Sequence, residues 1–259
     1  METLREQWVA GRTTMGGWLS VPSSVSAEAA ARVGFDFVCV DTQHGAIEYQ
    51  TAVGMLQAIA LGAGAPIVRV PWNEPGIIGK MLDAGAEGVI VPMVNSAAEA
   101  EAVVRACRYA PAGSRSWGPS VTGMRHSDYF AWARDNVAVI PMIETVEALG
   151  RLDEILSTPG VDAIYVGPAD LSVSLGLPPG NNDDRAEFTE ALVAIVAACR
   201  NAGVVPGIHA SGALSARRLE QGFQMITVAN DLLAIRTRMA DELNLAHGAL
   251  ASTGSDAIY

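Results

Sequence analysis

The segment "FDFVCVDTQHG", residues 35–45, runs from a continuous apolar stretch into a polar turn. Residues 37–40 do not alternate with polar residues, as a strand with one solvated face would. A short apolar run of this kind is typical of a parallel strand that is covered on both faces. Asp41, Gln43 and His44 follow at the carboxyl end of this strand. The segment therefore predicts a parallel sheet with ionisable side chains at one end.

Seven further apolar runs repeat this plan along the chain, and the segments between them have helical character. Together the runs cover residues 15–21, 35–41, 66–71, 88–94, 137–145, 162–170, 204–210 and 223–231. The first helical segment illustrates the pattern, since Ser23 and Ser24 are favoured N-caps and Gly34 is a favoured helix stop. Eight strand–helix units in 259 residues predict one closed (β/α)8 barrel, the TIM barrel of α/β proteins, whose typical length is about 250 residues.

A doubly wound open sheet is the competing fold. Eight regular units favour closure of the sheet, and no GxGxxG follows the first strand. We expect a single domain over residues 1–250 and a small, polar, flexible tail over residues 251–259. The longest segment predicted to be irregular covers residues 110–136, between the fourth and fifth strands.

The composition excludes several classes of partner. The chain has 17 Lys and Arg against 28 Asp and Glu, a net charge of −11, which argues against a nucleic-acid partner. No run of 18 apolar residues is present, so no membrane span is predicted, and the N-terminal residues lack the apolar region of a secretory signal. Cys39, Cys107 and Cys199 lie in apolar segments without a CxxC, which indicates reduced thiols in a cytoplasmic protein.

In a (β/α)8 barrel the chemistry lies at the carboxyl ends of the strands. Glu144 and Asp170 follow adjacent strands of the prediction. Their carboxylates could share a divalent cation, because hard oxygen ligands suit Mg²⁺ and Mn²⁺. The alternative is that one of them only caps the helix that follows it.

Three other polar residues near strand ends each allow two interpretations. Arg69 lies in an apolar strand and needs an anion, either a bound carboxylate or enolate or a structural salt bridge. His44 could be a general base near neutral pH, or a loop histidine bonded to the Asp41 side chain. His209, at the end of the seventh strand, could contact a substrate or merely cap that strand. Asp83, judged by position alone, is an ordinary solvated residue.

Four segments, taken together and in order, resemble the HpcH/HpaI aldolase family of metal-dependent class II pyruvate aldolases. They are "FDFVCVDTQHG", "IVRVPWNEPGIIGKMLDAGAEGVIVPMVNSAAEA", "PMIETVEAL" and "YVGPADLSVSLG". The similarity runs from about Gly16 to Leu233. It implies cleavage of a 4-hydroxy-2-oxo acid into pyruvate, or a related 2-oxo acid, and an aldehyde through a metal-stabilised enolate.

The resemblance also implies roles for individual residues. His44 matches the catalytic base, and Arg69 matches the arginine that holds the pyruvate oxygen and stabilises the enolate. Glu144 and Asp170 match the two ligands of a divalent ion such as Mg²⁺, Mn²⁺ or Co²⁺. Asp83 matches an aspartate that pairs with the catalytic histidine of a neighbouring subunit. The family therefore implies a homo-oligomer, a hexamer built as a trimer of dimers, with an exchanged C-terminal helix.

Within "GPAD" (Gly167, Pro168, Ala169 and Asp170), the backbone at Ala169 matches a position that contacts the substrate carboxylate. Asp41 is expected to steady the turn or the water network beside His44. The chain also departs from the family. Those departures are Gln43 where Glu is common, Met142 where close relatives have a substrate-binding Gln, Trp117 within "SRSWGPS", and His209 in place of an apolar residue. They gather on the aldehyde side and suggest an acceptor unlike a long dicarboxylic semialdehyde.

Three other functions compete with this interpretation. An acyl-CoA carbon–carbon lyase of the citrate lyase β or malyl-CoA type would share the barrel and the acidic pair, but it would need a basic surface for the CoA phosphates. A non-catalytic binding barrel is disfavoured by the intact set of rim residues. A phosphate-binding barrel would place glycine-rich turns after the last two strands, where this chain has "HASGALS" and "ANDLLAI".

Overall fold

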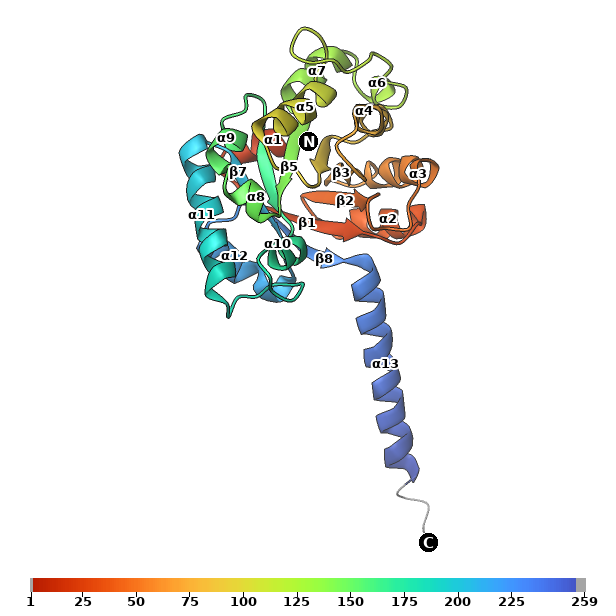
Figure 1. Ribbon diagram of the computed structural model, residues 1–259. Coiled ribbons are helices and arrows are strands. Elements are labelled where there is room, and N and C mark those ends of the chain that lie inside the picture. The colour runs from red at the N-terminus through yellow and green to blue at the C-terminus, as the bar shows by residue number, and fades with distance from the viewer. Residues whose placement is uncertain (1, 255–259) are drawn as a thin grey trace.

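A computed structural model describes residues 2–254; residue 1 and residues 255–259 lie outside the described part. Eight parallel strands close into a barrel in chain order, which confirms the predicted TIM barrel (Figure 1). The strands are β1 (Thr14–Leu19), β2 (Phe37–Asp41), β3 (Ala65–Arg69), β4 (Gly88–Val91), β5 (Ala138–Ile143), β6 (Ala163–Val166), β7 (Val205–His209) and β8 (Met225–Asn230).

Helices follow the strands and cover the outside of the barrel. They are α1 (Leu4–Val9), α2 (Ser24–Ala31), α3 (Tyr49–Ile59), α4 (Pro75–Asp83), α5 (Ala97–Cys107), α6 (Thr122–Arg125), α7 (Tyr129–Asn136), α8 (Val146–Leu149), α9 (Leu152–Leu156), α10 (Pro168–Ser174), α11 (Ala186–Ala202), α12 (Ser215–Gln221) and α13 (Asp231–Gly254), with a 3₁₀ turn at Gly212–Leu214. The predicted N-cap is confirmed at Ser23, whose side chain accepts a hydrogen bond from the Ser26 N–H.

Strands β2, β3 and β5 are buried on both faces along their whole length, as their continuous apolar sequences predict, whereas the second half of β8 is only partly buried. In β2, Phe37 and Cys39 belong to the cluster inside the barrel, whereas Val38 and Val40 pack outward against the helices. Gly16 is required opposite Phe37, because a Cβ at Gly16 would lie 2.1 Å from that ring. This rigid wall fixes where each strand ends and therefore where the rim side chains stand.

The N-terminal segment contains a short helix that the strand pattern did not predict. The capping box of α1 joins Thr3 and Glu6, and the helix buries Leu4 and Trp8 in the cluster that fills the barrel. The prediction of an irregular segment over 110–136 was wrong for its second half, which forms α6 and α7. The Asp128 side chain caps α7 by accepting a hydrogen bond from the Ala131 N–H. Aspartate is a favoured N-cap, but the many glycine and proline residues just before it made the whole segment look irregular.

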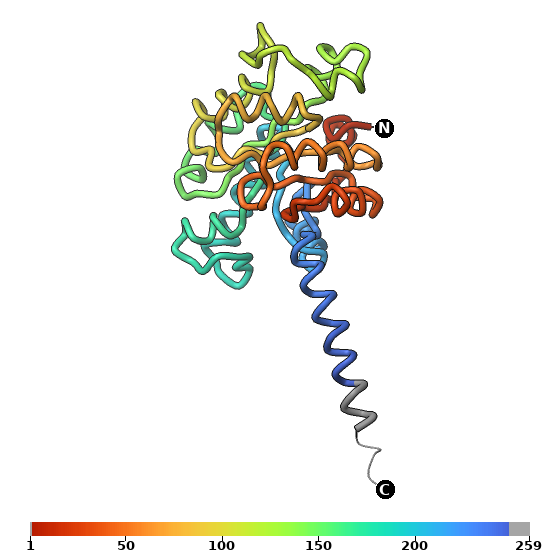
Figure 2. Tube along the Cα trace, turned by 90° about the vertical axis from the view of Figure 1, so that its right-hand side faces the viewer, coloured from red at the N-terminus to blue at the C-terminus, as the bar shows by residue number. Residues whose placement is uncertain are grey.

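The last helix, α13, leaves the barrel and extends away from it in both views (Figures 1 and 2). Its first residue, Asp231, accepts hydrogen bonds from the backbone N–H groups of Ser20 and Val21, which anchors the helix to the end of β1. The helix continues through Gly254, into the predicted flexible tail, and the rest of that tail lies outside the described residues. No helix in residues 2–254 is both long enough and apolar enough to cross a membrane.

Candidate active site

A cavity of about 380 Å³ opens at the carboxyl ends of the barrel strands. Nine residues that the sequence singled out line it: Asp41, His44, Arg69, Met142, Gly167, Pro168, Ala169, Asp170 and His209. Glu144 lies directly behind this lining and is 2% exposed. The closed barrel thus brings residues from five strand ends to one place, as the rule for barrel enzymes predicts.

Asp41 is the centre of a hydrogen-bond network beneath the cavity. Its carboxylate accepts from Arg69 Nε at 2.9 Å and Nη2 at 2.6 Å, and from Trp18 Nε1 at 3.1 Å. Burial opposes ionisation of Asp41, but the Arg69 guanidinium outweighs burial and lowers the pKa of this carboxyl below its ordinary value. The Asp41 side chain is therefore a fixed anion at the base of the cavity.

The same carboxylate shapes the turn that carries His44. Asp41 Oδ1 accepts from the backbone N–H groups of Gln43 at 3.1 Å and His44 at 3.2 Å. Gly45 closes the turn, since a Cβ there would lie 2.2 Å from the Asp41 carbonyl oxygen. The contact between His44 and Asp41 thus uses the histidine backbone. Within residues 2–254 the imidazole has no hydrogen-bond partner, and it is exposed at the mouth of the cavity.

Arg69 combines the two possibilities that its sequence position left open. It forms a structural ion pair with Asp41. Burial alone would lower the pKa of Arg69, but the hydrogen bonds and the charge of Asp41 leave it raised above its ordinary value. The pair uses Nε and Nη2, so Nη1 has no partner among the described residues. Trp18 supports the guanidinium from one side, with Cζ 4.9 Å from the ring centroid. Arg69 is therefore held rigidly and keeps one nitrogen for an anion in the cavity.

Glu144 and Asp170 form an acidic pair at the neighbouring strand ends. Glu144 Oε1 accepts from the Met93 N–H at 2.8 Å, and Oε2 lies where a Cβ on Gly167 would be only 2.3 Å away. Burial, reinforced by the charge of Asp170, raises the pKa of Glu144 to about 7. A buried carboxylate beside a second carboxylate is a donor set that a divalent cation would stabilise.

Capping explains the position of only one of these carboxylates. Thr145 caps α8 by accepting from the Ala148 N–H at 3.0 Å, so Glu144 is not the cap. Asp170 lies in the first turn of α10, where a negative charge is favourable without any metal. No third His, Cys, Asp or Glu joins the pair among the residues that the structure describes. The protein itself therefore offers two ligands, which leaves room for substrate and water on an octahedral ion.

His209, the last residue of β7, lines the cavity beside Trp18 and Tyr165. Its Nδ1 is 3.4 Å from the Tyr165 hydroxyl, and its ring meets the Trp18 ring edge to face at a centroid distance of 5.0 Å. Burial, with the charge of Arg69, lowers the pKa of His209 to about 4. This imidazole is neutral at physiological pH, and it can donate or accept a hydrogen bond but carries no charge.

Besides Glu144, three residues that the sequence singled out do not line the cavity of their own protomer. Asp83 pairs with Arg115 at 2.5 Å, beside a separate pocket between α4 and α5. Trp117 is 61% exposed and packs on Tyr109, with centroids 5.1 Å apart, because the long segment turns it away from the barrel mouth. Gln43 does not line the cavity, and its backbone N–H, not its side chain, donates to Asp41.

The structure adds residues that reasoning from the strand ends missed. Trp18, Ser20 and Asn230, on or next to β1 and β8, line the cavity, as do Tyr165 and Asn181. Trp18 and Asn230 each lie near the carboxyl end of an apolar run, as Asp41 does. An indole and an amide carry no charge at a strand end, so the sequence alone did not distinguish them from ordinary strand residues.

Known proteins resemble this chain over nearly its whole length. The family model described as HpcH/HpaI aldolase/citrate lyase matches residues 14–237. A hydroxypyruvate/pyruvate aldolase of Rhizorhabdus wittichii is 42% identical, with 90% of this chain and 93% of that protein covered. A 4-hydroxy-2-oxo-heptane-1,7-dioate aldolase of Shigella sonnei is 39% identical, with 96% of each chain covered.

Solved structures agree with the sequence comparison. The crystal structure of an HpcH/HpaI aldolase/citrate lyase family protein from Burkholderia cenocepacia superimposes with a TM-score of 0.87 at 32% identity. That comparison covers 94% of this chain and 98% of the other. The chain belongs to the HpcH/HpaI aldolase/citrate lyase family.

Proposed function

We propose that this protein is a carbon–carbon lyase that reversibly cleaves 4-hydroxy-2-oxo acids into a 2-oxo acid, pyruvate or a close relative, and an aldehyde. One observation carries the proposal: a free imidazole, a rigid guanidinium with an unused nitrogen and the Asp170 carboxylate line a single cavity, with Glu144 directly behind Asp170. The names of the two aldolase relatives support it. Each of the three groups has a separate task in the cleavage of a carbon–carbon bond.

Glu144 and Asp170 would hold the divalent cation, with Mg²⁺, Mn²⁺ and Co²⁺ as the candidates. When bound, such an ion supplies a Lewis acid that polarises the oxo group of the substrate. The donor set fits this task because both ligands are hard oxygens and because Glu144 is held by the Met93 N–H and by the close approach of Gly167.

Arg69 Nη1 donates to the 2-oxo oxygen and stabilises the negative charge that grows there as the enolate forms. The Asp41 pair holds this nitrogen in place before the substrate arrives, so little reorganisation is needed during the reaction. The backbone N–H groups of Ala169 and Asp170 have no acceptor among the described residues, and they are available to the substrate carboxylate. Together these donors orient the 2-oxo acid at the rim.

His44 moves the proton. In cleavage its imidazole accepts the proton of the 4-hydroxyl group, directly or through one water, while the bond between C3 and C4 breaks, and the enolate then takes up a proton at C3 to give the 2-oxo acid. In the reverse reaction, aldol addition, the imidazole returns the proton to the oxygen that becomes the 4-hydroxyl group. The turn built on Asp41 places the imidazole at the cavity mouth. Asp83 of a neighbouring copy would orient the ring, since Asp83 lies outside the cavity of its own protomer.

This assignment requires an oligomer, and a hexamer made of three dimers would provide it. The described part of α13 has exposed apolar side chains: Leu232, Leu233, Ile235, Met239, Leu243 and Leu245. Exchange of α13 between copies would bury these side chains. Light scattering or analytical ultracentrifugation of the full chain measures the assembly, and a monomer that retains full activity would contradict the shared site.

An acyl-CoA lyase is the competing function. Among the described residues that line the cavity, Arg69 is the single Lys or Arg, and it is already paired with Asp41. The CoA phosphates would find no other cation there. Incubation with malyl-CoA tests this alternative directly, and thioester-dependent cleavage faster than 4-hydroxy-2-oxo-acid cleavage would replace the aldolase proposal.

The main experiment is a panel of aldehydes with pyruvate and with hydroxypyruvate, each in the presence of Mg²⁺, Mn²⁺ or Co²⁺. We expect metal-dependent aldol addition that EDTA abolishes. His44→Ala should lose it, whereas His247→Ala, a change of an exposed histidine on α13, should not. Proton exchange of pyruvate gives an independent readout. Absence of exchange with Mn²⁺ and Co²⁺, with no effect of His44→Ala, would overturn the proposal.

A further inference from the structure

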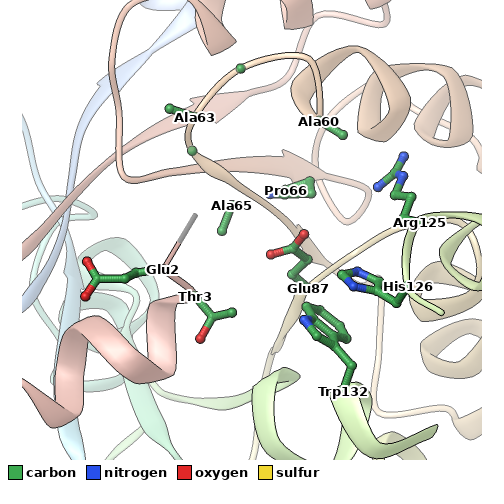
Figure 3. Close-up of a pocket in the computed structure, with 12 residues that line it drawn as sticks. Glu2, Thr3, Ala60, Ala63, Ala65, Pro66, Glu87, Arg125, His126 and Trp132 are labelled. Atoms are coloured by element: carbon green, nitrogen blue, oxygen red, sulfur yellow. The ribbon is translucent and has the colours of Figure 1, made fainter. Parts of the chain in front are cut away.

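A second cavity of about 240 Å³ lies at the amino-terminal end of the barrel, away from the catalytic rim (Figure 3). Its walls come from the starts of β3 and β4, the loop before β3, the start of α1 and the segment from Arg125 to Trp132. Neither the proposed reaction nor the family's catalytic residues use this cavity. Its side chains, however, are not those of an ordinary structural gap.

Glu87 stands at the centre of the cavity (Figure 3). It directly precedes β4, and its backbone is held in the barrel by hydrogen bonds to Pro66 and Ala138. Within residues 2–254 its carboxylate has no hydrogen-bond or ion-pair partner. Burial raises the pKa of this carboxyl to about 7, against the opposing charge of Arg125. A half-buried carboxylate without a partner is only partly solvated, and a bound ligand would complete its surroundings.

Arg125 supplies the opposite charge without neutralising Glu87. No carboxylate among the described residues lies within ion-pair distance of it, and its one hydrogen bond runs from Nη1 to the Gly85 carbonyl at a long 3.4 Å. Gly85, at φ +120°, makes room for the guanidinium, because a Cβ there would lie 2.9 Å from Nη1. Glu87 and Arg125 therefore place an anion and a cation on the cavity wall, and both keep unused hydrogen-bonding capacity.

The remaining walls leave space between these two charges. His126 and Trp132 stack face to face with centroids 4.0 Å apart, and they form an aromatic side. The opposite loop contributes only glycine, alanine and proline to the lining, at Ala60, Gly62, Ala63, Gly64, Ala65 and Pro66. These small side chains leave the space beside the two charges open.

The other charged group at the edge of the cavity is already engaged. Glu2 pairs with Arg12 at 2.5 Å, and the Thr3 hydroxyl caps α1. A ligand therefore meets Glu87 and Arg125 as its charged partners.

We propose that this cavity binds a small zwitterion of the α-amino acid class, with its ammonium group on Glu87 and its carboxylate on Arg125. A simple cation would leave Arg125 uncompensated, and a simple anion would leave Glu87 uncompensated. Pockets for drug-sized ligands measure roughly 300–1,000 Å³, so a cavity below that range selects a small molecule. The inference is independent of the catalytic assignment, because it concerns the other end of the barrel.

Titration calorimetry on the full chain tests this proposal, with glycine and L-alanine as probes. The catalytic cavity is kept saturated with pyruvate and Mn²⁺, so that heats from that end are excluded. We expect both amino acids to bind. Glu87→Gln and Arg125→Gln should each lower the affinity for L-alanine about 10-fold or more, which is the effect of losing a hydrogen bond to a charged group. Glu101→Gln and Arg134→Gln remove exposed charges of the same kinds and should leave the affinity unchanged.

Acetate and ethylamine, each carrying one of the two charges, complete the design. If either of them binds as tightly as L-alanine, the cavity is a site for a simple ion, and the proposal that it binds a zwitterion is wrong. Absence of heat with glycine and L-alanine, or binding that survives both substitutions, would overturn the site itself. Circular dichroism identifies a variant that fails to fold, and Arg125→Gln, which alters a partly exposed side chain, keeps the test decisive if Glu87→Gln fails.

Discussion

Asp41 and Arg69 form a buried, two-pronged ion pair that links the turn of His44 to the cavity floor. Arg69 Nε donates to Asp41 Oδ1 at 2.9 Å and Arg69 Nη2 donates to Oδ2 at 2.6 Å. The exposed fraction of the side chain is 3% for Asp41 and 11% for Arg69. Because β2 and β3 are in register at these residues, the barrel backbone itself aligns the two side chains. One carboxylate thereby positions both the proposed base and the proposed enolate-stabilising group.

Asp41→Asn should therefore damage stability and activity together. It leaves the buried guanidinium without a counter-charge, and breaking a buried pair in this way costs about 3–5 kcal/mol. The free energy of unfolding, measured by urea titration, should fall by this order. Glu28→Gln breaks the exposed pair with Arg32 and should have little effect. An Asp41→Asn protein with unchanged stability would mean that Arg69 finds another anion.

Glu144→Gln should remove metal-dependent turnover. The amide keeps the size of the side chain but loses the charge that a divalent cation requires, and we expect a loss of about 10²-fold or more in kcat at a fixed Mn²⁺ concentration. Glu147→Gln, an exposed change in α8 three residues later, is the matched control. Metal titration by calorimetry separates lost binding from lost chemistry, and unchanged Mn²⁺ affinity would exclude Glu144 as a ligand.

The barrel could be predicted from the sequence because its signal is local and repeated. Each strand is a short apolar run that ends in a glycine-rich or polar turn, and the eight runs coincide with the eight observed strands. The helix α1 escaped prediction because its six residues are too few for a clear periodic pattern, although Thr3 and Glu6 form a recognisable capping box. A regularly repeated pattern can be predicted from the sequence, whereas a single short helix cannot.

The site was predictable only in part, for a different physical reason. The position at a strand end revealed Asp41, Arg69 and Glu144, because the barrel brings all strand ends to one rim. The pairing of Arg69 with Asp41 was not readable, since it depends on the register between β2 and β3. The cavity around Glu87 was not readable either, because its walls join the start of the chain to residues more than a hundred positions later.

His209→Leu should change the acceptor preference of the proposed aldolase. The neutral imidazole adds polarity beside Tyr165 and Trp18, and its replacement makes that wall apolar. We expect kcat/KM to rise about 10-fold for an apolar aldehyde relative to glycolaldehyde, the usual range for a changed pocket contact. Because the pKa of His209 is lowered to about 4, the preference of the parent enzyme should stay constant between pH 6 and 8, roughly. Succinic semialdehyde as the preferred acceptor of the parent enzyme would contradict this view of the wall.

Glu87→Gln should alter how stability depends on pH. The folded state raises the pKa of this carboxyl from its ordinary 4.5 to about 7, so between these values the folded state binds more protons than the unfolded state. The free energy of unfolding therefore falls as pH rises through this window, by at most about 3 kcal/mol. Relative to the parent protein, Glu87→Gln should gain stability at about pH 8 and not at about pH 4.

Urea titrations at both pH values measure this difference, and Glu101→Gln on the exposed face of α5 is the control. The ligand proposed for this cavity would reduce the effect, because an ammonium group stabilises the ionised carboxylate. Equal stability differences at the two pH values would show that Glu87 is already compensated in the folded protein.

Gly167→Ala tests whether the backbone at the rim holds Glu144 in place. A Cβ at Gly167 would lie 2.3 Å from Glu144 Oε2 and 2.9 Å from the Met142 methyl group, and both of these atoms are the free ends of side chains. The carboxylate must therefore move, and we expect the affinity for Mn²⁺ to fall about 10- to 100-fold, as for other disturbed ligand supports. Gly79→Ala, in α4 with nothing within 4 Å of its Cβ, should leave metal affinity unchanged. If Gly167→Ala binds Mn²⁺ as the parent does, the position of Glu144 does not depend on this contact, and the acidic pair must be held by the Met93 N–H alone.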